Sequence, residues 1–129
     1  MSVLIGIPEP TTAHLGIDRL GEQCRVHPTV SVMRWGERER VLQHGDRVSI
    51  YAYDRLVLGD VEASADVGLD VGSGTIINVG AYLSGEGGLT IGGDVLIGAD
   101  VKLLSAGHEI DGGDEIIALL NEVSAGLDD

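Results

Sequence analysis

Residues 67–102 read VGLDVGSGTIINVGAYLSGEGGLTIGGDVLIGADVK, and this stretch decides the fold because it repeats every six residues. When it is set out in sixes from Val67, the fifth column is aliphatic in every row: Val71, Ile77, Leu83, Leu89, Val95 and Val101. The second column is glycine in five of the six rows and Glu86 in the other. An ordinary half-buried strand alternates with a period of two, so a period of six requires a different architecture.

The two columns indicate short strands joined by tight turns. An aliphatic residue with glycine three places before it suits an extended segment with an inward side chain, next to a turn that needs an unhindered backbone. Helix is excluded, because twelve glycines lie from Gly59 to Gly107 and each costs up to about 1 kcal/mol in a helix interior. Evenly spaced short strands stack as the coils of a β-solenoid. The alternative, an antiparallel sandwich, is disfavoured because hairpin dipeptides at matched spacing are missing.

Composition limits the classes of partner. The chain has 129 residues, enough for one domain, and a formal net charge of −13 with Lys102 as its single lysine. Such a charge opposes binding to nucleic acid or to anionic lipid. No apolar run approaches the roughly 18 residues of a membrane span, and residues 1–10 carry no basic residue, so we expect a cytoplasmic protein. Cys24 is the only cysteine, and we expect it to be a small buried side chain.

The stretch IGGDVLIGADVKLLSAGHEID at 91–111 resembles the hexapeptide-repeat acyltransferases, specifically the sugar O-acetyltransferases related to maltose and galactoside acetyltransferases. The resemblance covers about residues 45–111, with VHPTVSV at 26–32 similar to a first hexad. It implies a left-handed parallel β-helix with three hexads per coil. It also implies a homotrimer that moves an acetyl group from acetyl-CoA to a sugar or polysaccharide hydroxyl, at sites between neighbouring subunits.

The pattern and the resemblance together divide the chain into three parts. Residues 1–44 are expected to form an irregular N-terminal segment that contains the first hexad. Residues 45–111 are expected to form the coils and the catalytic loop. Residues 112–129 are expected to form a short helical cap, because apolar residues recur with helical spacing at 116, 117, 119, 120 and 123, with Asp114 as N-cap and Gly126 as stop.

His108 is the candidate catalytic residue. It matches the histidine that follows the last hexad before the catalytic loop in the family, which acts as general base. An unperturbed imidazole pKa of about 6.5 suits proton removal from a sugar hydroxyl near neutral pH. The hydroxyl oxygen would then attack the thioester carbonyl directly, and a backbone amide would stabilise the oxyanion. The competing interpretation is a polar loop residue at the end of the solenoid.

Asn78 and Glu86 are the candidate acceptor-binding residues. The resemblance implies an asparagine 30 residues before the histidine and an acidic residue eight places after that asparagine, which match Asn78 and Glu86. An amide and a carboxylate can both hydrogen-bond hydroxyl groups. Asn78 is equally well explained as a turn or ladder residue. For Glu86, a solvated loop carboxylate is the favoured interpretation.

The remaining polar residues carry no catalytic assignment. Tyr82 either lines the acceptor site or covers an edge of the solenoid, and Trp35 is given no role. His14, His27 and His44 lie outside the repeat, and the coils supply too few histidines for a zinc site, so no metal is expected.

The pattern departs from the family after His108. Members of the family continue with further coils that supply most of the acetyl-CoA site, whereas 21 residues follow His108 here. We therefore expect the chain to correspond to the front part of such an enzyme, with its activity open to question and with no residue assigned to the acetyl-CoA site. The alternative from a different class is a catalytically silent solenoid that serves as an assembly or scaffold piece.

Overall fold

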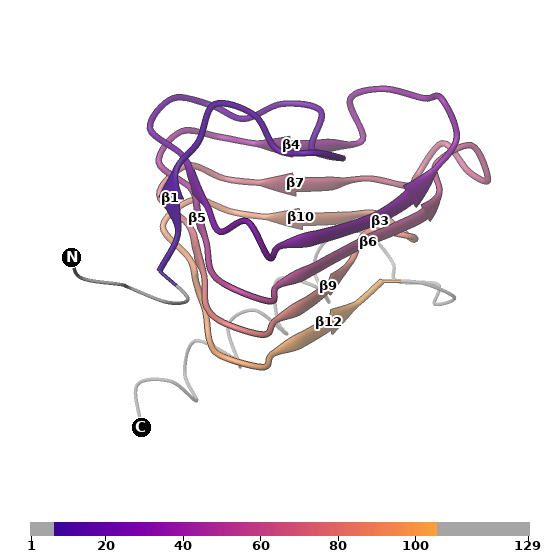
Figure 1. The fold of residues 1–129 in the computed structure, drawn as a ribbon. Helices are drawn as coiled ribbons and strands as arrows, with labels where there is room; N and C mark the ends of the chain where they lie inside the picture. The colour runs from indigo at the N-terminus through magenta and orange to yellow at the C-terminus, as the bar shows by residue number, and fades with distance from the viewer. Residues whose placement is uncertain (1–6, 106–129) are drawn as a thin grey trace.

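The computed structural model describes residues 7–105, and these form a parallel β-solenoid of about three turns with no helix among them (Figure 1). The expected all-β solenoid is thus confirmed. His108 and the expected helix at 112–129 lie outside the described residues.

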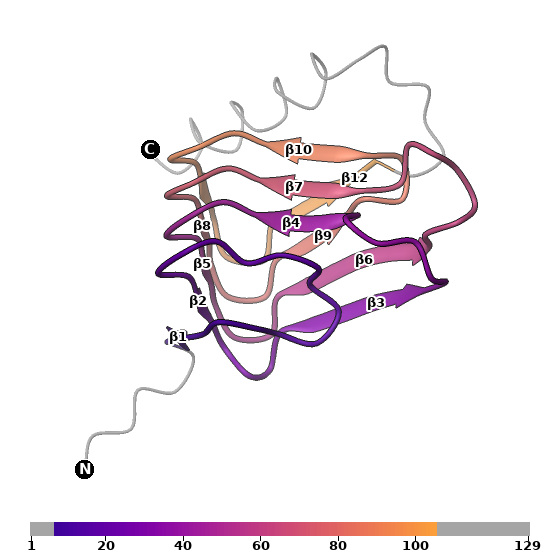
Figure 2. The same cartoon turned by 90° about the horizontal axis from the view of Figure 1, so that it is seen from above.

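Each turn contributes one short strand to each of three sheets, here called the first, second and third faces (Figures 1 and 2). The first face contains β1 (Glu9–Pro10), β2 (Arg25–Val26), β5 (Ser49–Ile50), β8 (Ile76–Ile77) and β11 (Leu96–Ile97). The second face contains β3 (Ser31–Trp35), β6 (Arg55–Asp60), β9 (Tyr82–Ser84) and β12 (Lys102–Leu104). The third face contains β4 (Leu42–His44), β7 (Leu69–Val71) and β10 (Leu89–Ile91). All pairs are parallel except β1 with β2.

The aliphatic repeat forms the core, as the sequence predicts. Strand partners stack in register, so the inward residues build three ladders: Val26–Ile50–Ile77–Ile97, Leu56–Leu83–Leu103 and Leu42–Leu69–Leu89. All of these side chains are at most 4% exposed. Full burial of one such side chain stabilises the fold by roughly 1.5–3 kcal/mol relative to exposure.

The coil is longer than the three hexads implied by the resemblance. Partners Ile77 and Ile97 are 20 residues apart, whereas three hexads would give 18. The extra two residues lie in the third face, where β10 buries both Leu89 and Ile91. The inward column therefore shifts by two after Leu89, so that Ile97 takes the core position predicted for Val95, which is only partly buried.

The solenoid begins earlier than the expected boundary at residue 45. Strands β2, β3 and β4 pair in register with β5, β6 and β7, so residues 25–44 already form a turn. The pattern is obscured there because loops between the second and third faces lengthen the turns. Val26, Ile50 and Ile77 are successive partners, 24 and 27 residues apart.

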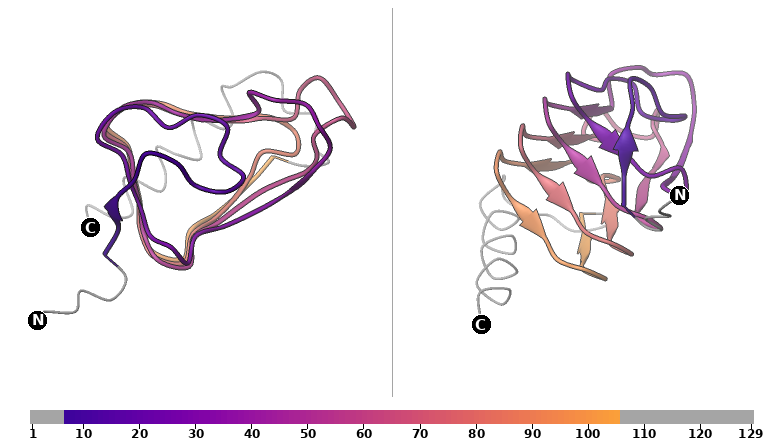
Figure 3. Two further views of the ribbon diagram at one scale, coloured as in Figure 1. Left: turned by 45° about the horizontal axis from the view of Figure 1, so that its top comes forward. Right: turned by 60° about the vertical axis from the view of Figure 1, so that its left-hand side comes forward.

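Left-handed backbone conformations recur at the corners, which superimpose when the coil is viewed nearly end-on (Figure 3). Before the first face, Arg47, Gly74 and Asp94 occupy the same corner position with φ of 53°, 76° and 56°. Glycine and aspartate adopt this region more readily than other residues. Of the five glycines in the sequence column, Gly74 and Gly80 have such a conformation, so left-handed turns explain the column only in part.

Residues before β2 close the N-terminal end of the stack. Ile17 and Leu20 pack against the core, and the Arg34 guanidinium donates a 2.8 Å hydrogen bond to Asp18 Oδ2. The same oxygen accepts hydrogen bonds from the backbone N–H groups of Val41 and Leu42. The thiol of buried Cys24 donates a hydrogen bond to the Gly45 carbonyl oxygen, which fits the structural role expected for Cys24.

Candidate functional site

Glu86 lies at the corner between the second and third faces, directly after β9, with its side chain exposed. Ser84 Oγ donates to Glu86 Oε1 at 3.4 Å and accepts from the Glu86 backbone N–H at 3.4 Å. Gly59 of the preceding turn lies beside this carboxylate and has a left-handed backbone conformation, with φ of 62°, which favours glycine. Gly59 follows a β-bulge in β6, where the register with β3 shifts after Met33. Bulges of this kind often re-aim side chains beside active sites.

A second serine links this corner to the end of the described chain. Ser105 Oγ donates a 2.6 Å hydrogen bond to the Ser84 carbonyl and accepts one of 3.1 Å from the Gly87 N–H. Ser84 and Ser105 are both buried, at 1% and 2% exposed, next to the exposed Glu86. Ser84, Glu86 and Ser105 are called the serine–glutamate cluster below. Neither serine carries a sequence signal that distinguishes it from a loop residue.

Asn78 lies at a different corner. It follows β8, between the first and second faces, so it and Glu86 flank the opposite ends of β9. Its Oδ1 accepts a 2.7 Å hydrogen bond from the Val79 N–H, and its own N–H donates to the Ile97 carbonyl. Within one chain the structure does not bring Asn78 and Glu86 to a common point. Their expected role as acceptor-binding residues therefore gains no support from their positions within the coil.

Two buried ionisable groups that the sequence analysis did not single out have strongly shifted pKa values. Burial raises the pKa of Asp54 to about 8, against the opposing effect of hydrogen bonds from the N–H groups of Ala81 and Tyr51. Burial also lowers the pKa of His44 to about 4, and its Nε2 has no hydrogen-bond partner. Perturbed groups are candidates for catalysis when a ligand can reach them. Asp54 is 0% exposed and His44 is 3% exposed, so both belong to the interior of the fold.

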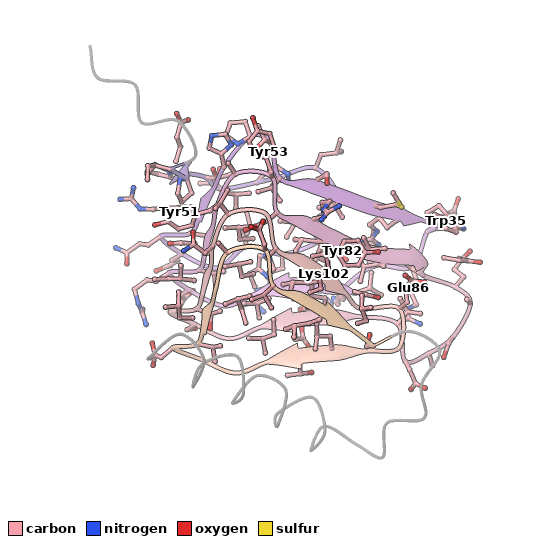
Figure 4. All side chains as sticks on the ribbon, turned by 90° about the horizontal axis from the view of Figure 1, so that it is seen from below. Trp35, Tyr51, Tyr53, Tyr82, Glu86 and Lys102 are labelled. Atoms are coloured by element: carbon pink, nitrogen blue, oxygen red, sulfur yellow. The ribbon has the colours of Figure 1, made fainter. Side chains whose placement is uncertain are left out.

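The outer side of the second face is aromatic and polar. Figure 4 shows Tyr53, Tyr82 and Trp35 spread along it, with Glu86 near Trp35. The Arg55 guanidinium carbon lies 5.1 Å from the centre of the Tyr82 ring, within the range of a cation–π contact. A hollow of about 390 Å³ lies at the Tyr53 end of this face. A larger hollow of about 550 Å³ lies on the third face and is lined by Asp18, Arg19, Glu39, Arg40 and Gln43.

No protein-family model matches the chain, and searches of curated proteins and of solved structures likewise find no match. Residues 7–105 contain no group of three or more His, Cys, Asp or Glu side chains arranged to hold a metal ion. Over the same residues, no helix is present that is long and apolar enough to cross a membrane.

Proposed function

We propose that the chain is an O-acyltransferase that moves an acetyl group from acetyl-CoA to a sugar or polysaccharide hydroxyl. The observation that carries the proposal is the serine–glutamate cluster, which forms a fixed polar corner at the C-terminal end of a parallel solenoid. His108, the candidate base, is three residues after Ser105 in the sequence.

The chemistry assigns each group one role. Glu86 accepts a hydrogen bond from an acceptor hydroxyl and so orients the sugar. His108 takes the proton of the reacting hydroxyl, whose oxygen then forms a bond to the thioester carbonyl carbon. The carbon–sulfur bond breaks, and the imidazolium returns the proton to the departing thiolate. Acetyl ester and free CoA are the products, with no covalent intermediate on the protein.

The acyl donor, the sugar acceptor, the homotrimer and the roles of His108 and Glu86 come from the resemblance. Sedimentation equilibrium of the purified chain measures the oligomeric state, with a mass of three chains expected. Asn78, at the far end of β9 from Glu86, is assigned to a more distant part of the acceptor rather than to the reacting ring.

The test is an assay of thiol release from acetyl-CoA with a panel of sugars and oligosaccharides. We expect acceptor-dependent release that His108→Ala abolishes and that Glu86→Gln lowers at least tenfold. Glu62→Gln is the matched control, because Glu62 is also an exposed carboxylate but lies in the loop after β6. Turnover that survives His108→Ala would contradict the assignment.

Absence of acceptor-dependent release would instead favour the second candidate, a catalytically silent assembly piece. The observation behind this candidate is the exposure of Met33, Trp35 and Leu104 on the second face, at 60%, 58% and 53%. Met33 and Trp35 lie on β3 and Leu104 on β12, the two edge strands of this face. Exposed apolar side chains at such edges can contact another protein. Under this candidate, His108→Ala would leave every measurable property of the protein unchanged.

A further inference from the structure

Tyr53 stands at a corner of the second face where its aromatic side chain is unusual for the backbone conformation. Ile50, Ile77 and Ile97 are in register, so Tyr53, Gly80 and Asp100 occupy the same corner position of successive turns. All three have left-handed backbone conformations, with φ of 62°, 74° and 61°. Glycine and aspartate suit this conformation, whereas a bulky aromatic residue in it is an outlier.

Packing does not explain why Tyr53 is there. The residue is 62% exposed, so its ring contributes little to the core. Its backbone N–H donates a 2.8 Å hydrogen bond to Thr29 Oγ1 of the preceding turn, which helps to hold the strained corner in place. Exposed left-handed residues stand at other corners too, Arg47 among them, so the backbone conformation alone assigns no function. Tyr53 differs in presenting an aromatic ring beside a hollow.

The hollow of about 390 Å³ beside Tyr53 has the chemistry of a sugar subsite. It is lined by an aromatic ring, a guanidinium, a carboxylate and two hydroxyls, from Thr29, Ser31, Tyr53, Arg55, Gly80 and Asp100. Arg55 and Asp100 are not within ion-pair distance of each other, since the ion pair found among residues 7–105 joins Arg34 to Asp18. Because hydroxyl groups both donate and accept hydrogen bonds, a sugar ring can accept from the Arg55 guanidinium and donate to the Asp100 carboxylate. The apolar face of the ring can stack on the tyrosine.

The hollow continues into a row of outward side chains. Ser31, Arg55, Tyr82 and Lys102 are in-register partners on β3, β6, β9 and β12, about 4.8 Å apart from strand to strand. Beyond Tyr82 the surface reaches Trp35 and Glu86 at the opposite end of the face (Figure 4). Aromatic rings therefore lie at both ends of the face and between them.

We infer that the outer side of the second face binds a neutral polysaccharide chain, with one sugar ring in the hollow at Tyr53 and the chain running over Tyr82 towards Glu86. This inference rests on the proposed function, because it names a polymer as the acceptor. The face carries charges of both signs, which suit hydroxyl groups because a hydroxyl both donates and accepts hydrogen bonds. The positive residues are Arg55 and Lys102, and the negative residues are Asp60, Glu86 and Asp100. The net charge of −13 disfavours a polyanion. A polymer also gives Asn78, at the same corner as the hollow, a contact distant from the reacting hydroxyl.

The experiment measures binding calorimetrically without an acyl donor, using cellohexaose, xylohexaose and maltohexaose as probes. We expect at least one hexasaccharide to bind and its monosaccharide to bind at least tenfold more weakly. Tyr53→Gly should lower the affinity about tenfold, since loss of a stacked aromatic ring removes a main anchor. Its thermal midpoint should not fall below that of the wild type, because glycine relieves the strained corner.

Arg47→Gly is the matched control. Arg47 has the same left-handed conformation at the corner before the first face, so the substitution relieves similar strain without touching the second face. Its hexasaccharide affinity should equal that of the wild type. Equal losses in both variants, wild-type affinity in Tyr53→Gly, or equal binding of polygalacturonate would overturn the inference.

The two proposals fail in different ways. Hexasaccharide binding that persists in a chain with no measurable thiol release would refute the proposed catalysis and leave the glycan surface standing. Transfer to a monosaccharide by a chain that binds none of the three hexasaccharides would refute the glycan surface alone.

Discussion

Asp54→Val should remove a pH dependence of folding stability that the wild-type chain carries between about pH 6.5 and pH 8. Asp54 occupies a corner position at which the other turns have an aliphatic or small residue. These equivalent residues are Val30, Ala81 and Val101. The side chain of Asp54 is 0% exposed, and burial raises its pKa to about 8 from the ordinary value of 3.8. Valine is therefore a side chain that this corner already accommodates.

The sign follows from the protons bound in each state. An unfolded aspartate loses its proton near pH 3.8, whereas the folded chain keeps it up to about pH 8. Between these values the folded state binds more protons, so the free energy of unfolding falls as pH rises. The contribution is complete below pH 3.8 and is lost as pH passes through 8. From pH 6.5 to 8 the wild type should lose about 1.5 kcal/mol of stability through this one group.

The pH range above 6.5 is chosen because a second buried group changes the free energy of unfolding in the opposite direction at lower pH. Burial lowers the pKa of His44 to about 4, so its contribution changes mainly between pH 4 and pH 6.5. Asp54→Val also removes the acceptor of the Ala81 N–H. The equivalent N–H groups of Val30 and Val101 bond to the carbonyl three residues earlier, and Ala81 can do the same in the variant.

Urea denaturation followed by circular dichroism at pH 6.5, 7.2 and 8 measures the effect. The stability of Asp54→Val relative to wild type should rise by about 1.5 kcal/mol across this range. Asp70→Val is the control, because it removes an exposed carboxylate from β7, and its difference from wild type should stay nearly constant. An Asp54→Val difference that does not change with pH would refute the reasoning.

Three further substitutions test the coil. Gly72→Ala should prevent or severely destabilise folding, because its Cβ would run into the backbone of Gly92 in the next turn, and thermal melting measures this. Arg38→Ala should lower the free energy of unfolding by about 2 kcal/mol in urea titrations, because its guanidinium donates to the carbonyls of Ser64, Ala65 and Val67. His44→Val should gain about 1–2 kcal/mol of stability relative to wild type when pH falls from 7 to 5, since the buried imidazole resists protonation. A constant difference between pH 7 and pH 5 would show that His44 is accessible to solvent.

The regular part of the coil could be predicted because each residue there serves one geometric purpose. From Val71 to Leu89 the inward side chains fall every six residues, and the column read from the sequence matches the core. The shift at Ile91 could not be predicted, because Leu89 and Ile91 are both aliphatic and either fits the column. In the coil that contains β2, β3 and β4, the sequence indicated only the first hexad at 26–32, because loops break the period beyond it.

The candidate site was predictable only in part. Glu86 could be found because it interrupts the glycine column. Tyr53 and Asp54 could not be found, since their corner aligns with Gly80, Ala81, Asp100 and Val101 only after the lengths of the turns are known. Ser84 and Ser105 could not be predicted as part of the site, because they are joined by a hydrogen bond between turns that a local sequence pattern does not show.

The length of the coil is the most direct test of the stacked solenoid on which the site depends. Ile76 and Leu96 are in-register partners with outward, exposed side chains, about 4.8 Å apart across parallel strands. That separation falls within the Cα range of a disulfide. Mass spectrometry after mild oxidation should find a cross-link in Ile76→Cys/Leu96→Cys and none in Asn78→Cys/Leu96→Cys, the pair that an 18-residue coil would align. A cross-link in the second pair alone, or in neither, would contradict the stacked 20-residue coil.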